Sequence, residues 1–299
     1  MTGTTTRTDT IRLWPARAYR DTFAPDAPAP VEGAELPPGW HGLYFLPDLG
    51  LDALRPDGTP ARDGVVPGID LPRRLFAGEE MTFHRPIRYG DTLDLTVSLD
   101  RMEDKHGRSG RLVFVTIAKT FGPVGDPAVT VRQHDVFLGP ADPARPARPQ
   151  PGPDGHAWEQ PLDLGPIHLF RYSALTYNSH LIHYNDPWAR EVEGQPGLLV
   201  HGPLTSMLLL DFAVRRSGAA PRRRTRCARS RPSTSAPRCG SPGGPSPAGR
   251  GCGSWTSRAA CSSARTSGSA VDGGRRTNRP ARTRPAKTGL TASSGGRCG

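Results

Sequence analysis

The composition of the chain changes abruptly after residue 214, and this change limits how much of the sequence can enter a folded core. Residues 215–299 contain eighteen Arg, one Lys and a single acidic residue, Asp272, and almost no Ile, Leu, Val or Phe. Their charge is 19 − 1 = +18, so the net charge of +11 leaves residues 1–214 at 11 − 18 = −7. A segment so poor in apolar residues cannot offset the entropy lost on ordering. We expect an acidic folded body followed by a disordered basic tail.

Two origins of this tail remain open. One is a genuine disordered tail, and the other is translation out of frame beginning near residues 214–220. The 36 Arg against three Lys indicate GC-rich coding DNA, whose out-of-frame reading is rich in Arg, Gly, Ala, Pro, Ser and Cys. All five cysteines follow the break, which favours the frameshift: Cys227, Cys239, Cys252, Cys261 and Cys298. Their spacing and odd number match neither a disulfide framework nor a zinc site, so we expect no metal.

The location of the charge also bears on the partners. A basic chain suggests nucleic acid, but the basic residues are concentrated in the tail, where Trp255 is the only aromatic side chain that could stack on a base. No apolar run approaches the length of a membrane span, and the N-terminus lacks the layout of a signal peptide. We therefore expect no nucleic-acid partner, no membrane partner and a cytoplasmic location.

The folded body is predicted to contain an antiparallel sheet. Its first forty residues, rich in Thr, Ala and Pro, predict a loose arm. Three later segments have strand patterning, with turn residues at 105–110 between the first two: 92–99, 111–121 and 128–138. Residues 140–153 are Pro-rich and predict a linker. The expected organisation is an N-terminal domain at 1–139, this linker, a second domain at 154–214 and the tail at 215–299.

The second predicted domain contains a helix that is apolar nearly all round. It starts at Gly202-Pro203, where proline is tolerated because the first helical N–H needs no partner, and continues through Phe212. Such a helix requires burial inside a sheet. Residues 215–299 contain no credible strand to cover it, so we expect the full chain to be unstable or inactive.

Three residues around this helix could act together on a substrate. His183 has the side chain best suited to exchange a proton near neutral pH, and Asn178, five positions earlier, could hold a water beside it. Gly202 opens the buried helix, so its backbone N–H could stabilise negative charge on a carbonyl oxygen. Taken singly, His183 is more often a structural histidine and Asn178 a cap or turn residue. The combination favours an active site.

The string from Tyr172 to Asp186, YSALTYNSHLIHYND, and the later Val-His-Gly-Pro resemble the hydratase signature of MaoC-like hot-dog proteins. The resemblance places the catalytic His at His183, the catalytic Asp at Asn178 and the helix-start Gly at Gly202. The signature's Asn and Pro are replaced by His180 and Leu181. With Asn in place of Asp, the motif resembles the version found in the hydroxyacyl-thioester dehydratase type 2 and mesaconyl/itaconyl-CoA hydratase branch.

The N-terminal half supports the same resemblance through Arg73-Arg74-Leu-Phe-Ala-Gly, Phe83-His-Arg-Pro and Gly107-Arg-Ser-Gly, so that it covers residues 10–214. Arg73 and Arg74 are either a solvated pair or an anchor for CoA phosphates or a substrate carboxylate. His180 and His201 are further substrate-binding candidates, although His201 is also expected to stabilise the turn before the helix.

The resemblance implies an α+β fold, a double hot dog in which an antiparallel sheet wraps a central helix twice, here with an incomplete second hot dog. It implies a hydro-lyase that adds water to an enoyl-CoA or removes it from a 3-hydroxyacyl thioester on CoA or acyl carrier protein. It implies no cofactor, an acyl-thioester substrate as partner, and a homodimer as one possible assembly. The alternative is a non-catalytic acyl-CoA-binding remnant of the same fold.

Overall fold

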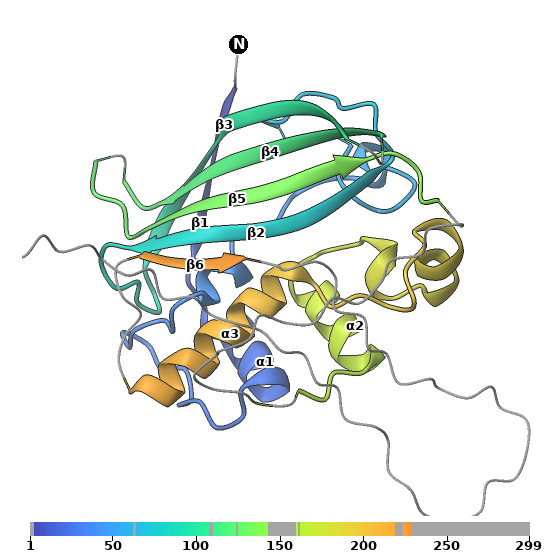
Figure 1. Cartoon of the computed structure of the whole chain (residues 1–299). Coiled ribbons are helices and arrows are strands. Elements are labelled where there is room, and N and C mark those ends of the chain that lie inside the picture. Colours follow the sequence, from blue (N-terminus) through green and yellow to red (C-terminus); the bar gives the residue numbers. More distant parts are fainter. Residues whose placement is uncertain are drawn as a thin grey trace, which may run out of the picture. The chain divides into compact units, whose positions relative to one another are not determined.

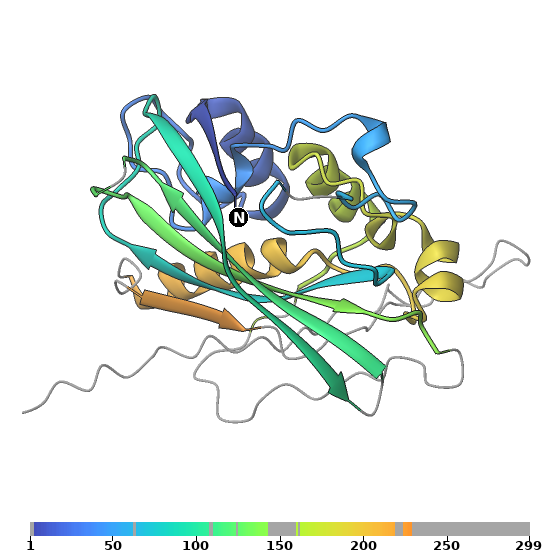
Figure 2. The same ribbon diagram turned by 90° about the horizontal axis from the view of Figure 1, so that it is seen from above.

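The computed structural model describes residues 3–61, 64–107, 110–123, 125–142, 160, 162–218 and 224–228. Within them the chain forms one six-stranded antiparallel sheet, with the helices α1, α2 and α3 on one side of it (Figures 1 and 2). The strand order is β1-β3-β4-β5-β2-β6. The first predicted domain supplies the first five strands, and the second predicted domain supplies α2 and α3.

The centre of the sheet confirms the three strands predicted from alternation. They are β3 (Thr92–Gly107), β4 (Gly110–Phe121) and β5 (Val129–Leu138). β3 is longer than predicted, because pairing continues past a bulge between Leu99 and Arg101 into a polar stretch without alternation. There the Arg111 guanidinium pairs with the Asp104 carboxylate at 2.6 Å, which supports the pairing across the strands.

The beginning of the chain is ordered, so the prediction of a loose arm is wrong. β1 (Thr4–Thr10) pairs with β3, and the Thr10 and Thr92 hydroxyls lie 2.9 Å apart across the pair. Threonine is β-branched and suits a strand that has a partner available, even without hydrophobic alternation. α1 (Leu13–Phe23) follows and buries Ala16 and Tyr19. Tertiary pairing overrode the composition here.

The edge of the sheet corrects a second expectation. β2 (Arg73–Phe83) pairs with β5 on one side and with β6 (Arg224–Ala228) on the other. The prediction that no strand follows residue 214 is therefore wrong over these five residues. Backbone N–H and C=O groups at a sheet edge pair with little regard to side chains, so hydrophobicity gave no signal. Residues 219–223 and 229–299 of the predicted tail and residues 143–153 of the predicted linker lie outside the described residues.

The predicted apolar helix is present as α3 (Gly202–Ser217). Its buried side chains include Leu204, Met207 and Leu210, and it packs against β2, while α1 packs against α2 (Pro166–Leu175). Asp211 of α3 accepts hydrogen bonds from the Trp40 indole at 2.8 Å and the Tyr19 hydroxyl at 3.0 Å. These bonds tie the helix to α1 and to the short helix η1 (Trp40–Leu43) of the N-terminal half.

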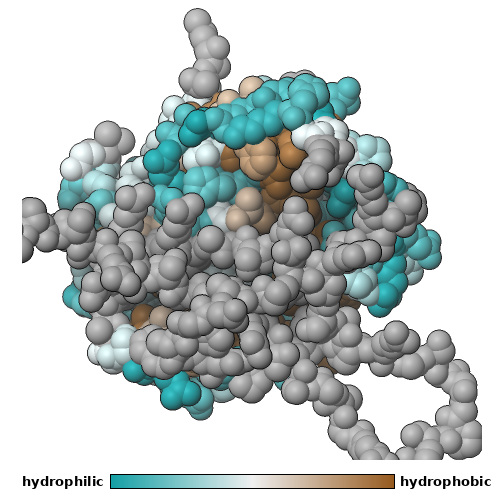
Figure 3. All heavy atoms as spheres, in the orientation of Figure 1, coloured by the Kyte–Doolittle hydropathy of each residue, from teal (hydrophilic) through white to brown (hydrophobic). Residues whose placement is uncertain are grey.

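The exposed face of the sheet is partly apolar. Figure 3 shows hydrophobic side chains gathered over the middle of the sheet, below a hydrophilic rim. The strand register places Val136 and Phe114 side by side, and both are at least partly exposed.

Candidate active site

His183 ends the short helix η3 (Leu181–His183), in a buried position beside the start of α3. Its Nδ1 lies 2.8 Å from the carbonyl oxygen of Leu199. A carbonyl can only accept, so in the neutral ring Nδ1 carries the proton and Nε2 carries the lone pair. The backbone thereby selects the tautomer in which Nε2 is the basic atom.

A second histidine supports this ring from one side. His201 stacks on His183 with ring centroids 3.6 Å apart and an interplanar angle of 21°. It is completely buried, and its Nε2 lies 2.8 Å from the Ser173 hydroxyl. The edge of Tyr172 meets its ring at 4.8 Å. His201 therefore fixes the position of His183, which agrees better with the turn-stabilising interpretation than with direct substrate binding.

Gly202 lies at the first position of α3, where the sequence predicts it. Its N–H belongs to the first turn, whose N–H groups have no partner inside a helix and lie at the positive end of the helix dipole. A Cβ at this position would lie 2.2 Å from Cδ1 of Phe76 on β2. Close packing against Phe76 is thus a second reason for glycine, which the sequence alone does not reveal.

Asn178 lies in the turn between α2 and η3. Its side-chain oxygen accepts a hydrogen bond from the backbone N–H of His180 at 3.0 Å, and the preceding Tyr177 has a left-handed backbone with φ of 51°. The hydrogen bond is typical of an Asx turn, and the positive φ of Tyr177, uncommon for a bulky residue, places a tight turn just before it. The turn uses the amide oxygen, so a water beside His183 would be held through the NH₂ group of Asn178.

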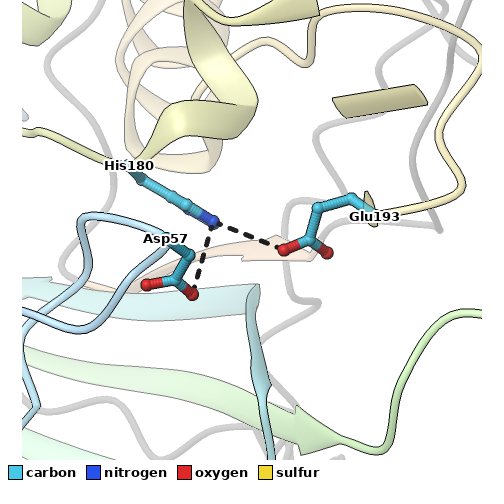
Figure 4. Close-up of side chains that lie close together, drawn as sticks. All are labelled: Asp57, His180 and Glu193. Carbon is cyan, nitrogen blue, oxygen red and sulfur yellow. Dashed lines mark ion pairs between the residues drawn. The ribbon is translucent and has the colours of Figure 1, made fainter. Parts of the chain in front are cut away.

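His180 lies between two carboxylates rather than at an accessible surface. Its Nε2 is 3.9 Å from Oδ2 of Asp57 and 4.0 Å from Oε1 of Glu193 (Figure 4). All three residues are buried. Burial raises the pKa of the Glu193 carboxyl, and the neighbouring His180 and Arg73 outweigh this, so that its pKa lies below the ordinary value. We call Asp57, His180 and Glu193 the acidic-histidine cluster.

Arg73 and Arg74 are neither a solvated pair nor directed together at one ligand. The Arg73 guanidinium pairs with Glu193 at 2.8 Å, and that of Arg74 pairs with buried Asp135 at 2.6 Å. Neighbouring residues of a strand point to opposite faces of the sheet, which separates the two side chains. An anchoring role for either residue stays a prediction, and it would compete with these ion pairs.

A buried carboxyl that the sequence analysis did not single out lies on β2, under α3. Burial raises the pKa of Glu79, while a hydrogen bond from Ser206 and the charge of Lys119 lower it in part. The sequence analysis also did not select four groups that contact the candidate site residues: Asp57, Glu193, the Leu199 carbonyl and Ser173. Asp57 belongs to an Asp-Gly turn signal, and nothing in the sequence indicates that this turn meets His180 from far along the chain.

Comparisons with known proteins identify the family of the chain. The family model described as hydroxyacyl-thioester dehydratase type 2 matches residues 39–227. The chain is 40% identical over 218 residues to a mesaconyl-C(4)-CoA hydratase from Chloroflexus aurantiacus, covering 69% of this chain and 74% of that protein. It is 53% identical to a mitochondrial hydroxyacyl-thioester dehydratase type 2 from Schizosaccharomyces pombe over 57 residues, which are 19% of this chain and 18% of that one.

Solved structures share the fold at lower identity. A MaoC-like dehydratase superposes with a TM-score of 0.52 and 20% identity, covering 78% of this chain and 83% of that one. A MaoC-like dehydratase from Phytophthora capsici gives a TM-score of 0.51 and 15% identity, covering 77% and 81%. These likenesses establish the hot-dog fold. In the described part of the chain no helix has the length and hydropathy needed to cross a membrane. The chain belongs to the hydroxyacyl-thioester dehydratase type 2 family of MaoC-like hot-dog proteins.

Proposed function

We propose that this protein is a hydro-lyase that adds water to the double bond of an enoyl thioester, or removes it from a 3-hydroxyacyl thioester. The observation that carries the proposal is the bond between His183 Nδ1 and the Leu199 carbonyl. It makes Nε2 the basic atom of the ring and holds the ring at Leu199, three positions before Gly202 at the start of α3. The family membership and the mesaconyl-C(4)-CoA hydratase relative support the same reaction class.

The proposed reaction needs only proton transfer and a charged transition state. Nε2 of His183 takes a proton from water while the water oxygen bonds to the β-carbon of the enoyl group. The electron pair of the double bond moves toward the thioester carbonyl, whose oxygen gains negative charge beside the Gly202 N–H. The α-carbon then takes this proton from Nε2 of His183 as the carbonyl re-forms, which returns the ring to its neutral form, and dehydration runs through the same steps in reverse. As proposed, the reaction requires no cofactor.

Asn178 is assigned to the water rather than to proton transfer. An amide cannot act as a general acid or base near neutral pH, and its oxygen already accepts the His180 N–H. Its NH₂ group can donate to the water oxygen and orient a lone pair toward the β-carbon. His183 is then the single acid-base group of the reaction.

The substrate proposed for this protein is taken from the names of its relatives. We propose a CoA or acyl carrier protein thioester as substrate, with mesaconyl-CoA and 3-hydroxyacyl thioesters as the first to test. We further propose the division into domains at 1–139 and 154–214 joined by residues 140–153, a homodimer, and a cytoplasmic location.

A second candidate function is acyl-thioester binding without turnover. It is favoured by Asn178, which replaces the carboxylate of the hydratase signature and whose oxygen is used in a turn. Measurable CoA-thioester affinity with no hydration would establish this function in place of the first.

The test is hydration of mesaconyl-CoA and crotonyl-CoA by the full chain, followed as loss of absorbance of the conjugated thioester. We expect His183→Gln to lower kcat by about 10²- to 10⁴-fold, the range for losing a general acid-base group. His106→Gln, a substitution of an exposed histidine on β3, is the matched control and should retain the rate. Equal rates for wild type and His183→Gln would refute the proposed role.

A further inference from the structure

We propose that the acidic-histidine cluster of Asp57, His180 and Glu193 is a binding site for a first-row divalent metal ion, with zinc as the best-fitting ion. The proposal does not depend on the proposed hydration reaction, because that reaction uses no metal. The ion would bind beside the turn that carries His183, and its function would be to hold this turn in place.

The three residues come from three separate segments. Asp57 lies in the loop after the short helix η2 (Leu51–Ala53), His180 precedes η3, and Glu193 follows the π-helical turn η4 (Trp188–Val192). One imidazole nitrogen and two carboxylate oxygens lie within 4.8 Å of one another, and all three residues are buried (Figure 4). Nitrogen and oxygen donors in this number are a ligand set that zinc accepts.

The distances suit shared coordination better than direct hydrogen bonding. The His180 nitrogen lies 3.9 and 4.0 Å from the two carboxylate oxygens, beyond the range of about 2.7–3.2 Å for a hydrogen bond. Two ligands of one tetrahedral zinc ion, each bonded at about 2.0–2.1 Å, lie about 3.4 Å apart. To reach this spacing, the His180 nitrogen must approach each carboxylate oxygen by about half an ångström, and the two carboxylate oxygens, which lie within 4.8 Å of each other, must close by at most about 1.4 Å. Side chains make adjustments of this size on binding.

Two buried atoms at the centre lack a hydrogen-bond partner within the described residues. They are Nε2 of His180 and Oδ2 of Asp57. His180 is 8% exposed and Asp57 is 4% exposed. Buried polar atoms are normally satisfied, and a pair of them converging on one point requires a ligand between them. This observation distinguishes the cluster from a chance grouping of acidic residues.

The remaining atoms of both carboxylates are held by the protein. Oδ1 of Asp57 accepts hydrogen bonds from the Thr59 N–H at 2.9 Å and the Thr59 hydroxyl at 2.6 Å. Oε2 of Glu193 accepts one from Arg73 Nε at 2.8 Å. Hydrogen bonds to the outer oxygens of ligating carboxylates are a regular feature of metal sites, because they fix the orientation of the ligands.

Charge balance also favours a cation. Within the group formed by the cluster and Arg73, two carboxylates face one guanidinium, so a neutral His180 leaves one buried negative charge uncompensated. Burying an unpaired charge is costly. Either a metal ion at His180 Nε2 or a proton on that nitrogen supplies the missing positive charge. The two alternatives exclude each other at this atom, so an experiment can separate them.

The decisive experiment is zinc X-ray absorption spectroscopy on the full chain after its thiols have been alkylated with iodoacetamide and one equivalent of Zn²⁺ has been added. Alkylation is needed because free thiolates are zinc ligands and the chain has five cysteines outside the cluster. We expect one tightly held zinc with a shell of nitrogen and oxygen at about 2.0–2.2 Å and an imidazole contribution. A sulfur shell near 2.3 Å, or zinc that is lost on gel filtration, would overturn the proposal.

Variants locate the ion. Asp57→Asn, His180→Gln and Glu193→Gln should each weaken Zn²⁺ binding at least tenfold in equilibrium dialysis. Asp21→Asn and His106→Gln replace the same residue types at exposed positions and should bind as the wild type does. Equal affinity in all five variants would show that the zinc lies elsewhere.

A measurement on the unmodified sequence covers the case in which a cluster variant fails to fold. The Tm of the alkylated wild type should rise with Zn²⁺ and return to its starting value with EDTA, because an ion bound only by the folded state stabilises it. An unchanged Tm, together with an imidazolium signal from His180 by NMR at neutral pH, would show a proton in place of the metal. The loss or retention of hydratase activity would bear only on the proposed function.

Discussion

The two halves of the described chain reach stability by different means. The N-terminal half holds five strands whose backbones pair with one another along most of their length. The half that carries His183 consists of helices and turns, and β6 is the only strand that the described residues add after it. It is held to the N-terminal half by apolar packing of α3 in the shared core and by side-chain bonds: Asp211 with Tyr19 and Trp40, and Glu193 with Arg73.

From this difference we infer that the candidate active-site residues depend on contacts made by the other half. The turn bearing His180 and His183 is also docked by its backbone, since the Leu181 N–H donates to the Asp57 carbonyl at 2.8 Å. Changes at these contacts should therefore affect the half that carries His183 first, whereas changes inside the sheet should affect the whole molecule.

The largest expected effect separates the two neighbouring arginines of β2. Arg74→Met leaves the buried Asp135 carboxylate without its ion pair and should lower the free energy of global unfolding by about 3–5 kcal/mol. Arg73→Met should instead loosen residues 178–193. Amide hydrogen exchange should become faster in these residues and change less in the sheet. Urea denaturation and hydrogen-exchange mass spectrometry make the comparison.

Arg190→Met is the control for the arginine substitutions. Its pair with Asp186 is about half exposed, so its loss should cost under about 0.5 kcal/mol. Identical exchange maps for Arg73→Met and Arg74→Met would show that the two halves unfold as one unit.

The next effect concerns the loop around Gly58, which contacts the segment that carries Ser179, His180 and His183. Gly58 has φ of +82°, and a Cβ there would lie 1.9 Å from the backbone oxygen of Ser179. Gly58→Ala should therefore destabilise the protein by roughly 3 kcal/mol and reduce hydration activity more than sheet content. Gly33→Ala is the control, since Gly33 has φ of +75° with no atom within 4 Å of the added Cβ and should lose only roughly 1 kcal/mol.

Thermal melts followed by circular dichroism and the hydration rate measured below the melting transition test this pair. If both glycine variants lose the same stability and retain the same activity, contact with Ser179 is not what holds the turn.

The smallest effect depends on pH and concerns the attachment of α3. Burial raises the pKa of Asp211 to about 6, although hydrogen bonds from Trp40 and Tyr19 partly oppose this. Because the folded-state pKa is raised, the stability that Asp211 contributes is complete below pH 4 and falls as pH rises through about 6. Tyr19→Phe removes one donor, raises this pKa further and should cost about 1–2 kcal/mol at pH 7 and less at pH 4.

Unfolding free energies at pH 4, 5.5 and 7 measure this slope. Tyr184→Phe removes an exposed hydroxyl bonded to the Ser179 carbonyl and should change stability little at any pH. A Tyr19→Phe deficit that is constant with pH would show that the hydroxyl does not act through the charge of Asp211.

Sequence patterns predicted the parts of the fold that local order determines. β4 and β5 follow from apolar runs, and α3 follows from its apolar residues and the Gly-Pro start. β1 and β6 were missed because polar strands form only when an existing edge offers hydrogen bonds. The bulged continuation of β3 was missed because its partner strand, rather than its own pattern, keeps it extended.

The site divides in the same way. His183, Asn178 and Gly202 lie within 25 positions of one another and carry a motif, so a linear sequence is enough to select them. The partners of His180 and Arg73 depend on packing between distant segments. Asp57 and Glu193 are ordinary surface residue types whose burial decides their chemistry, and burial is a property of the fold.

The contact between Gly202 and Phe76 limits which residues can replace Gly202 during evolution. Any side chain at position 202 would overlap the aromatic ring, so substitution there is opposed whether or not the protein still turns over substrate. A lineage that lost its enzymatic activity would still inherit glycine at this position for as long as it kept the ring. Glycine at position 202 therefore reports on the packing of α3 against Phe76, and its presence in a related chain is not by itself a sign of retained catalysis.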